Sequence, residues 1–474
     1  MVGGTTRSTH GPAQALPAAE VDGLRSRIRG TAIGPGDAEY DAARKIWNAM
    51  IDRRPALIVR CADSADVVQA VNLAREQKLP LAIRGGGHNI AGNALCDDGV
   101  VIDLSALRSV RVDPQKRRAW VGPGATLADL DHETQSFGLA VPVGINSTTG
   151  VAGLTLGGGF GWISRKFGLA CDSLVGADVV TAKGDRIHAD AEENPDLLWG
   201  LRGGGGNFGV VTSFEFQLHS AGRQVLAGLV VYPYAQGASV LRKYRDFADS
   251  APDELTAWVV MRKAPPLPFL PAEVHGKEVV VIAICYVGDP AQGERAIAPL
   301  RALGTPVGEH VGAMPLTAWQ QAFDPLLVPG ARNYWKSHNF REASDGLLDK
   351  LLEFAGKLPS AECEVVLAQL GGETNRVAAD ATAYAHRDVR YLLNVHGRWT
   401  TAKEDEKGIG WARELFQATT PFATGGVYVN FLTGEETDRI KGAYGPNFDR
   451  MLQLKRKLDP TNLFHLNQNI QPTR

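Results

Sequence analysis

The sequence predicts an α+β protein of two domains, and three observations lead to this expectation. The chain has 474 residues, more than one hydrophobic core usually supports. Short runs of β-branched and aromatic residues, typical of strands, alternate with helical patterns through most of its length. Glycine clusters gather before about residue 220 and become sparse from there to about residue 424. We therefore expect a glycine-rich domain followed by a second α+β domain.

The chain begins with a loose stretch and then enters a strand, helix, strand unit. Residues 1–19 are small, polar and rich in Gly and Pro, which predicts a flexible N-terminus. Pro55–Arg60 predicts a strand, Ser64 is placed to cap the next helix, and Leu81–Arg84 predicts a second strand. This strand leads directly into the loop Gly85-Gly86-Gly87-His88.

Short elements follow, up to about residue 219. Helical periodicity covers Thr126–Phe137, and a glycine turn at Lys183–Asp185 predicts a hairpin. Polar turns separate the other runs, which predict strands at Val100–Leu104, Ser109–Asp113, Arg117–Val121 and Val210–Leu218.

The region from about residue 220 to 424 carries longer elements. Its strand-like runs include Val225–Pro233, Glu278–Val287 and Cys363–Gly372. Asp345–Leu358 has the apolar spacing of a helix that packs one face on a core. We expect these elements to form the second domain.

The C-terminal segment contains polar residues that could line a binding site. Gly426–Leu432 predicts a strand and Asn447–Lys457 a helix, and an Asn-rich tail follows. In a strand, Tyr428 and Asn430 would share one face and Phe431 would point to the other. The polar tail suits a binding site better than a core.

Composition and charge exclude several kinds of partner. A formal net charge of -2 gives no basic surface for nucleic acid or for an anionic membrane. No apolar run reaches the roughly 18 to 20 residues that cross a bilayer, and no secretory signal is recognisable, so we expect a cytoplasmic protein. We also expect a monomer or a homodimer. The five cysteines include no CxxC pair, which argues against a disulfide framework or a zinc site: Cys61, Cys96, Cys171, Cys285 and Cys363.

Three glycine clusters could bring backbone N–H groups close to a pyrophosphate, because glycine has no Cβ in the way. They are Gly85–Gly87, Gly144–Gly168 and Gly203–Gly209. The alternative is that each is only a tight turn. Gly204–Gly209 also fits the G-x-G-x-x-G pattern of nicotinamide-binding domains, which requires a helix to follow. Strand-like residues follow instead, so we disfavour a nicotinamide site.

His88 is the first candidate for chemistry. It ends a strand and a glycine loop, where an imidazole would lie at the edge of a concavity. A lone histidine is more often a packed side chain than a functional one. A metal site is disfavoured, because no second ligand stands at a suitable spacing, and we expect no metal.

Six segments together carry a resemblance to a known family. The sequence resembles bacterial berberine-bridge-enzyme-like oxidases of the vanillyl-alcohol oxidase/para-cresol methylhydroxylase (PCMH) flavoprotein superfamily, over nearly the whole chain. The segments are Arg84–Ala94, Val100–Ser105, Gly153–Leu174, Asp196–Phe216, Tyr428–Phe431 and Asp459–Ile470.

The resemblance implies a PCMH-type FAD-binding domain at 20–219 and 425–474, interleaved with a substrate domain at 220–424 that has an antiparallel sheet flanked by helices. It implies that His88 holds FAD covalently, and that Gly85–Gly87 and the Gly157–Gly161 loop form the pyrophosphate cradle. The residues that it places near the cofactor are Arg84, Gly85, Gly86, Gly87, Asn89, Gly92, Asn146, Thr149, Gly150, Gly153, Gly157, Gly158, Gly159, Gly161, Asn207, Gly209, Val211, Tyr428, Asn430, Asn467 and Asn469.

Departures from the family pattern bear on the chemistry. Asn146 stands where many members carry a second flavin-linking cysteine, so we expect a single link. Thr149 stands where members control oxygen access. Phe431 replaces the tyrosine that often serves as base. The identity of the catalytic base is therefore undecided. Tyr428 is the first choice, and the further candidates near the substrate are Asn430, Lys336, His338 and His396.

The resemblance implies an FAD-dependent oxidoreductase. We expect an oxidase that removes a hydride from an alcohol, a hemiacetal or an activated C–H of a small molecule and passes the electrons to O₂. The alternatives are a dehydrogenase with another electron acceptor, a nicotinamide dehydrogenase, and a flavin carrier without turnover.

Overall fold

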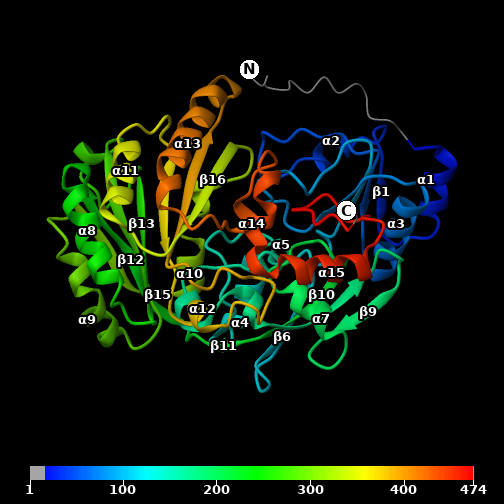
Figure 1. The fold of residues 1–474 in the computed structure, drawn as a ribbon, viewed down its shortest axis with the longest axis horizontal. Coiled ribbons are helices and arrows are strands. Elements are labelled where there is room, and N and C mark those ends of the chain that lie inside the picture. The colour runs from blue at the N-terminus through cyan, green and yellow to red at the C-terminus, as the bar shows by residue number, and fades with distance from the viewer. Residues whose placement is uncertain (1–15, 473–474) are drawn as a thin grey trace.

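One large antiparallel sheet, two smaller sheets and one two-stranded sheet organise residues 16–472, which the computed structural model describes (Figure 1). Of the flexible stretch expected at residues 1–19, residues 1–15 lie outside the described part. The last residues of that stretch are not flexible coil, because helix α1 (Ala18–Arg25) begins there and packs Leu24 into a core.

The first half of the chain builds the two smaller sheets. In the four-stranded sheet, of order β1-β2-β4-β3, β4 pairs in parallel with both β2 and β3. The five-stranded sheet, of order β5-β6-β10-β8-β9, is antiparallel. The strands are β1 (Thr31–Ile33), β2 (Leu57–Arg60), β3 (Leu81–Arg84), β4 (Val100–Asp103), β5 (Val110–Asp113), β6 (Arg118–Val121), β8 (Leu174–Val180), β9 (Arg186–Ala189) and β10 (Val210–Gln217), with a separate pair β7 (Leu139–Ala140) and β11 (His219–Ser220).

Side-chain caps define the starts of two helices beside these sheets. The carboxylate of Asp63 accepts the N–H groups of Ala65 and Asp66 at 2.9 and 3.1 Å, so Asp63 caps α3 and the predicted cap Ser64 is wrong. Thr126 caps α4 together with Asp129. The helices of this half are α2 (Tyr40–Ala43), α3 (Ser64–Glu76), α4 (Leu127–Gln135), α5 (Val151–Leu156), α6 (Ser164–Phe167) and α7 (Pro195–Leu201).

The second half builds a seven-stranded antiparallel sheet of order β15-β12-β14-β13-β17-β18-β16. Long runs of β-branched residues make these strands, and their register is continuous, as between β12 and β14. The strands are β12 (Gln224–Pro233), β13 (Leu255–Lys263), β14 (Glu278–Tyr286), β15 (Gly308–Pro315), β16 (Arg332–Phe340), β17 (Glu364–Gln369) and β18 (Tyr391–Trp399).

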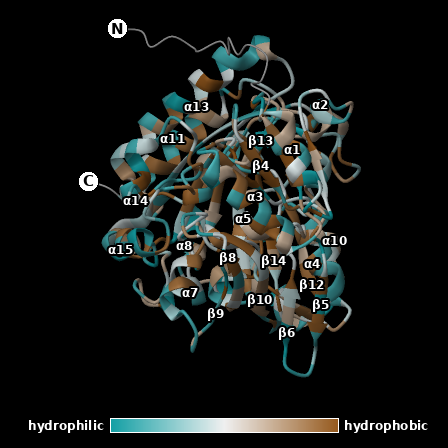
Figure 2. Ribbon diagram, turned by 90° about the vertical axis from the view of Figure 1, so that its right-hand side faces the viewer, coloured by the Kyte–Doolittle hydropathy of each residue, from teal (hydrophilic) through white to brown (hydrophobic). Residues whose placement is uncertain are grey.

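The two faces of this sheet have different partners, because side chains alternate along each strand. One face packs against four helices, which lie on the outer side of the molecule in Figure 1: α8 (Gly237–Ala248), α9 (Pro290–Arg301), α11 (Asp345–Ala355) and α13 (Asp405–Thr419). The other face packs against residues of the first half, such as Trp162. Figure 2 shows apolar residues on the central strands and polar residues on outer helices such as α13.

Two short helices and one arginine join the halves. Helix α10 (Leu316–Gln321) lies against α4, and α12 (Glu373–Arg376) lies against α6. The buried guanidinium of Arg165, on α6, donates to the carbonyls of Leu255 and Leu370 at 2.8 and 2.6 Å. These contacts hold the glycine-rich half against the inner face of the large sheet.

The C-terminal segment packs back onto the first half, where α14 (Ile440–Tyr444) and α15 (Phe448–Leu458) join its core. The strand predicted at Gly426–Leu432 is wrong, because Val429–Phe431 forms a 3₁₀ helix in which the Phe431 N–H donates to the Tyr428 carbonyl. Among residues 16–472, no helix combines the length and apolar character that crossing a membrane requires.

Candidate active site

A cavity of about 330 Å³ lies where the glycine-rich half meets the inner face of the large sheet. This volume falls in the range of small-molecule and cofactor sites. Its glycine wall includes Gly85–Gly87, Gly150, Gly153 and Gly205–Gly206. Its opposite wall, which we call the sheet wall, consists of Trp258, Trp335, Glu364, Val366, Ala368, Leu392, Asn394 and His396.

Close backbone approach explains why the glycine wall needs glycine. A Cβ on Gly86 would lie 2.3 Å from the Gly150 nitrogen, so the two loops can meet only without side chains. At Gly153, nothing lies within 4 Å of the place a Cβ would take. The backbone therefore borders the cavity directly, as a bound phosphate chain requires.

His88 lies at the carboxyl end of parallel strand β3, just past the glycine loop, and lines the cavity. Its ring stacks on Trp47, with ring centroids 5.0 Å apart and planes at 19°. Its Nε2 lies 3.0 Å from the Thr148 hydroxyl. Burial lowers the pKa of His88 to about 4, and the contact with Thr148 offsets only part of that effect. The imidazole is therefore neutral near pH 7.

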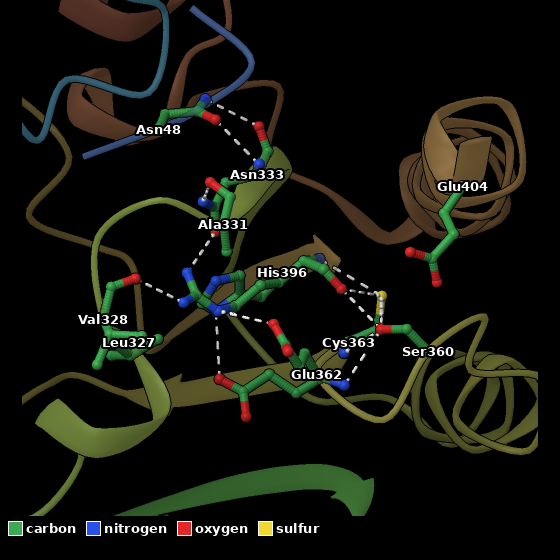
Figure 3. A network of polar contacts seen from close by, with 12 residues as sticks. Asn48, Leu327, Val328, Ala331, Asn333, Ser360, Glu362, Cys363, His396 and Glu404 are labelled. Atoms are coloured by element: carbon green, nitrogen blue, oxygen red, sulfur yellow. Dashed lines mark hydrogen bonds and ion pairs between the residues drawn. The ribbon is translucent and has the colours of Figure 1, made fainter. Parts of the chain in front are cut away.

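A polar network fixes the stacking partner of His88. The Trp47 indole donates to the Leu327 carbonyl at 2.8 Å, and Leu327 itself lines the cavity. Next to Trp47, Asn48 and Asn333 exchange two hydrogen bonds of 2.9 Å (Figure 3). Arg398 donates to the Val328 carbonyl at 2.7 Å. Both halves of the chain thus hold the ring against which His88 lies.

A row of side chains crosses four strands on the inner face of the large sheet and ends on the sheet wall. Arg262 donates to Glu364 Oε2 at 3.0 Å, Glu364 Oε1 lies 3.2 Å from His396 Nδ1, and the His396 ring meets Trp335 edge-on at 4.7 Å. The Glu364 side chain is only 13% exposed. Burial by itself would raise the pKa of Glu364, but Arg262 and His396 outweigh it and the pKa is lowered. Glu364 is therefore an acceptor for the Nδ1–H of His396.

Several buried polar atoms on the cavity lining have no hydrogen-bond partner among residues 16–472. They are His396 Nε2, Trp335 Nε1, Asn394 Oδ1 and Asn467 Oδ1. Leaving a buried polar atom unpaired costs about 1–3 kcal/mol. Such atoms at one cavity are expected where a bound molecule completes their hydrogen bonds.

Tyr428 lies at the junction of the two walls, beside Phe431 and Phe160. Its hydroxyl oxygen accepts the Gly159 N–H and an Asn430 amide N–H, each at 3.0 Å. Burial raises the pKa of Tyr428 to about 12 despite these hydrogen bonds. The expectation that Phe431 faces away from Tyr428 and Asn430 is wrong, because the 3₁₀ turn brings all three to the cavity.

The structure brings many of the predicted site residues to this cavity. Those that line it are Gly85, Gly86, Gly87, His88, Asn89, Asn146, Thr149, Gly150, Gly153, Gly209, Val211, His396, Tyr428, Asn430 and Asn467. Those that do not are Arg84, Gly92, Gly157, Gly158, Gly159, Gly161, Asn207, Lys336, His338 and Asn469.

Strand alternation explains the misplacement of two candidate bases. On β16, Trp335 faces the cavity, so Lys336 and His338 point to the helix-covered face. There Lys336 pairs with Glu435 at 2.7 Å, and His338 stacks on Phe416. Neither can reach a molecule in the cavity.

The Gly157–Gly161 loop also serves a different purpose from the one expected. A Cβ on Gly157 would lie 2.2 Å from Asn430 Oδ1, and Gly159 donates to Tyr428. The loop thus supports Tyr428 and Asn430 from behind. Asn207 likewise binds protein groups, and its side chain joins the Gly203–Gly209 loop to the C-terminal tail through the carbonyl of Gln468 at 3.2 Å.

Among the cavity residues that sequence reasoning missed, four matter most for the chemistry, and a fifth missed residue contacts His88. Trp47, Trp335, Glu364 and Asn394 line the cavity, and Thr148 contacts His88. Glu364 had a recognisable signal, because a carboxylate opening the apolar run Cys363–Gly372 needs a partner once buried. Trp47 and Trp335 had no local signal.

The glycine wall and the unpaired Asn467 oxygen fit a dinucleotide cofactor such as FAD. Residues 55–190 match the family model of an FAD-binding domain, and residues 427–471 match the model of berberine and berberine-like proteins. An FAD-linked oxidoreductase of Dictyostelium discoideum is 33% identical over 94% of this chain and 95% of its own length. The chain belongs to the berberine-like FAD-linked oxidoreductases.

Further comparisons agree with this membership. The (R)-6-hydroxynicotine oxidase of Paenarthrobacter nicotinovorans is 32% identical over 94% of this chain and 97% of its own length. The crystal structure of 6-hydroxy-D-nicotine oxidase from Arthrobacter nicotinovorans superposes with a TM-score of 0.85 at 30% identity, covering 94% of this chain and 98% of that one. The predicted family, the PCMH-type α+β fold, the enzyme class and FAD as cofactor are confirmed.

For this berberine-like oxidoreductase, the structure argues against a nicotinamide-binding site at Gly204–Gly209. The Gly204–Gly209 pattern leads into strand β10, not into a helix, so it lacks the helix N-terminus that a Rossmann site supplies. The same loop lines the cavity through Gly205, Gly206 and Gly209.

Proposed function

We propose that this protein is an oxidase that holds FAD through His88 and removes a hydride from a small molecule bound against the sheet wall, with O₂ as the electron acceptor. The observation that carries the proposal is that His88 and the glycine wall line the same cavity as the Glu364–His396 pair. Bound FAD would supply hydride acceptance, and the chain would supply orientation and proton transfer.

A single covalent link is part of this proposal. Asn146 has no thiol, and all five cysteines are free and buried. Burial raises the pKa of Cys171 well above its usual value, which removes the reactive thiolate. Flavin should therefore remain with acid-precipitated wild-type protein and be lost from His88→Ala. Tryptic mapping should yield one flavin-bearing peptide, and flavin on any cysteine would refute the single link.

We favour His396 as the base that takes the substrate proton. The carboxylate of Glu364 can only accept, so Nδ1 of His396 carries the proton and Nε2 offers a lone pair to the cavity. Tyr428, our first choice from the sequence, is less suited because a pKa near 12 keeps its hydroxyl protonated. Tyr428 and Asn430 would instead position bound groups.

The lining favours a flat substrate that carries a hydroxyl or an amine. Trp258, Trp335, Phe160 and Phe431 supply aromatic surface, and His396 Nε2 can accept one hydrogen bond. Small aromatic alcohols, phenols, cyclic amines and short sugars belong in the test panel. Hydrogen peroxide release identifies the substrate and the acceptor together.

Each alternative has its own outcome in that panel. Bleaching of the flavin without peroxide and without reoxidation in air indicates a dehydrogenase with another acceptor. A flavin that no compound bleaches under anaerobic conditions indicates a carrier, and either result overturns the oxidase. We further propose a cytoplasmic location, which the free, buried cysteines support.

A further inference from the structure

The turn at Asn146–Thr149 determines which way the Thr148 hydroxyl points. Asn146 Oδ1 accepts the backbone N–H of Thr148 at 3.1 Å, which identifies this atom as the amide oxygen, because a backbone N–H can only donate. The Thr148 hydroxyl lies 2.7 Å from the same oxygen and therefore donates its one proton there. The Thr149 N–H donates a hydrogen bond to the Asn146 carbonyl at 3.1 Å, which closes the turn.

This arrangement determines the tautomer of His88. With its proton given to Asn146, the Thr148 oxygen can only accept from His88 Nε2, 3.0 Å away. Nε2 therefore carries the hydrogen, and Nδ1 keeps the lone pair of the neutral ring. The stacked indole of Trp47 holds the plane of the same ring.

We propose that Asn146 and Thr148 are positioning residues for covalent flavin attachment, holding His88 as its Nε2–H tautomer so that Nδ1 forms the bond. The inference rests on the covalent link proposed above. In the step, a bond forms between Nδ1 and the 8α carbon of FAD, while one C–H of the 8α-methyl and the Nε2–H are lost. The two electrons and two protons reduce the flavin ring and then pass to O₂, giving H₂O₂.

The deciding comparison is Thr148→Val against Thr148→Ser. Valine has the shape of threonine without the hydroxyl, whereas serine keeps it. Each full-length protein is purified, incubated with excess FAD in air, and sampled over time for flavin that stays in the acid precipitate. We expect Thr148→Val to attach flavin at least about tenfold more slowly than wild type, and Thr148→Ser within about threefold. Total flavin after gel filtration should be equal in all three.

Asn146→Ala provides the second test. Without the amide oxygen, the Thr148 hydroxyl can also donate to Nε2, so both tautomers are populated and attachment should slow to a rate between those of wild type and Thr148→Val. Equal unfolding temperatures and equal non-covalent FAD binding separate positioning from misfolding. If Asn146→Ala unfolds at the wild-type temperature, binds FAD as wild type does and still attaches flavin at the wild-type rate, the role of Asn146 is overturned.

The two proposals fail in different ways. Wild-type protein that releases all its flavin on acid precipitation refutes the covalent link itself. If wild type holds flavin covalently but Thr148→Val attaches it at the wild-type rate, the role of Thr148 is refuted. The proposed link through His88 is then unaffected.

Discussion

His396 Nδ1 and Glu364 Oε1 lie 3.2 Å apart across neighbouring strands, with His396 Nε2 unpaired at the cavity. We predict that His396→Gln slows anaerobic flavin reduction by about 10²-fold, the usual scale for losing a general base. Glu364→Gln removes the charge that holds the ring and should cost about tenfold. Stopped-flow reduction with the substrate found in the panel measures both.

His338→Gln is the matched control for this experiment, because His338 lies on the adjacent strand with its ring on the helix-covered face. Its reduction rate should stay within about threefold of wild type. A loss in His338→Gln equal to that in His396→Gln would show that general damage to the sheet, and not base catalysis, explains the effect.

Tyr428→Phe should have a small effect of a different kind. Because the pKa of Tyr428 is about 12, its hydroxyl does not titrate near neutral pH, and the pH profile of flavin reduction should keep its shape. The rate should fall less than about tenfold, through loss of the acceptor for Asn430 and Gly159. A hundredfold loss with an altered pH profile would return the role of base to Tyr428.

Thr149 lines the cavity close to the His88 loop. We predict that its side chain controls how readily oxygen reaches the flavin. Thr149→Leu adds bulk there and should slow reoxidation of the reduced enzyme by about tenfold or more, with substrate-driven reduction nearly unchanged. Thr149→Val, of equal size, is the control. Reoxidation of the leucine variant at the wild-type rate would remove Thr149 from oxygen access.

Lys455 and Asp459 form a fully buried ion pair at 2.7 Å that ties the C-terminal tail to the glycine loop. The ammonium also donates to the carbonyls of Asn207 and Phe464 at 2.9 and 2.8 Å. Lys455→Met leaves the Asp459 charge unpaired, so we expect a loss of about 3–5 kcal/mol in the free energy of unfolding. Exposed Lys457→Met on the same helix should change it by less than about 0.5 kcal/mol. Denaturant unfolding measures both.

Asp131 is buried between the halves, where burial raises its pKa to about 7 although Gln320 donates to it at 3.2 Å. The folded state therefore holds this proton more tightly than the unfolded state. The contribution of Asp131 to the free energy of unfolding is therefore most favourable below about pH 4, and it becomes less favourable as the pH rises towards 7. Asp131→Asn should raise the free energy of unfolding by about 2–4 kcal/mol at pH 8, at about 1.4 kcal/mol per pKa unit, and change little at pH 4. Equal gains at both pH values would contradict this.

Much of the fold could be predicted from local patterns. The strands at Leu81–Arg84 and Val210–Gln217 were predicted from short apolar or alternating runs, which need no distant information. The segment at Tyr428–Phe431 has the same apolar character but curls into a 3₁₀ turn. Its hydrogen bonds go to a glycine loop more than 260 residues earlier in the chain, a contact without a local signature.

The sequence by itself determined what depends on contiguous residues: the glycine loops, the placement of His88 after a strand, and the family with its FAD. Only the tertiary structure decided which side chains face the cavity. Alternation along β16 separates Trp335 from Lys336, but which set meets the cavity depends on what packs on each face of the sheet. The pairing of Glu364 with His396 depends likewise on the register between β17 and β18, which long-range packing sets.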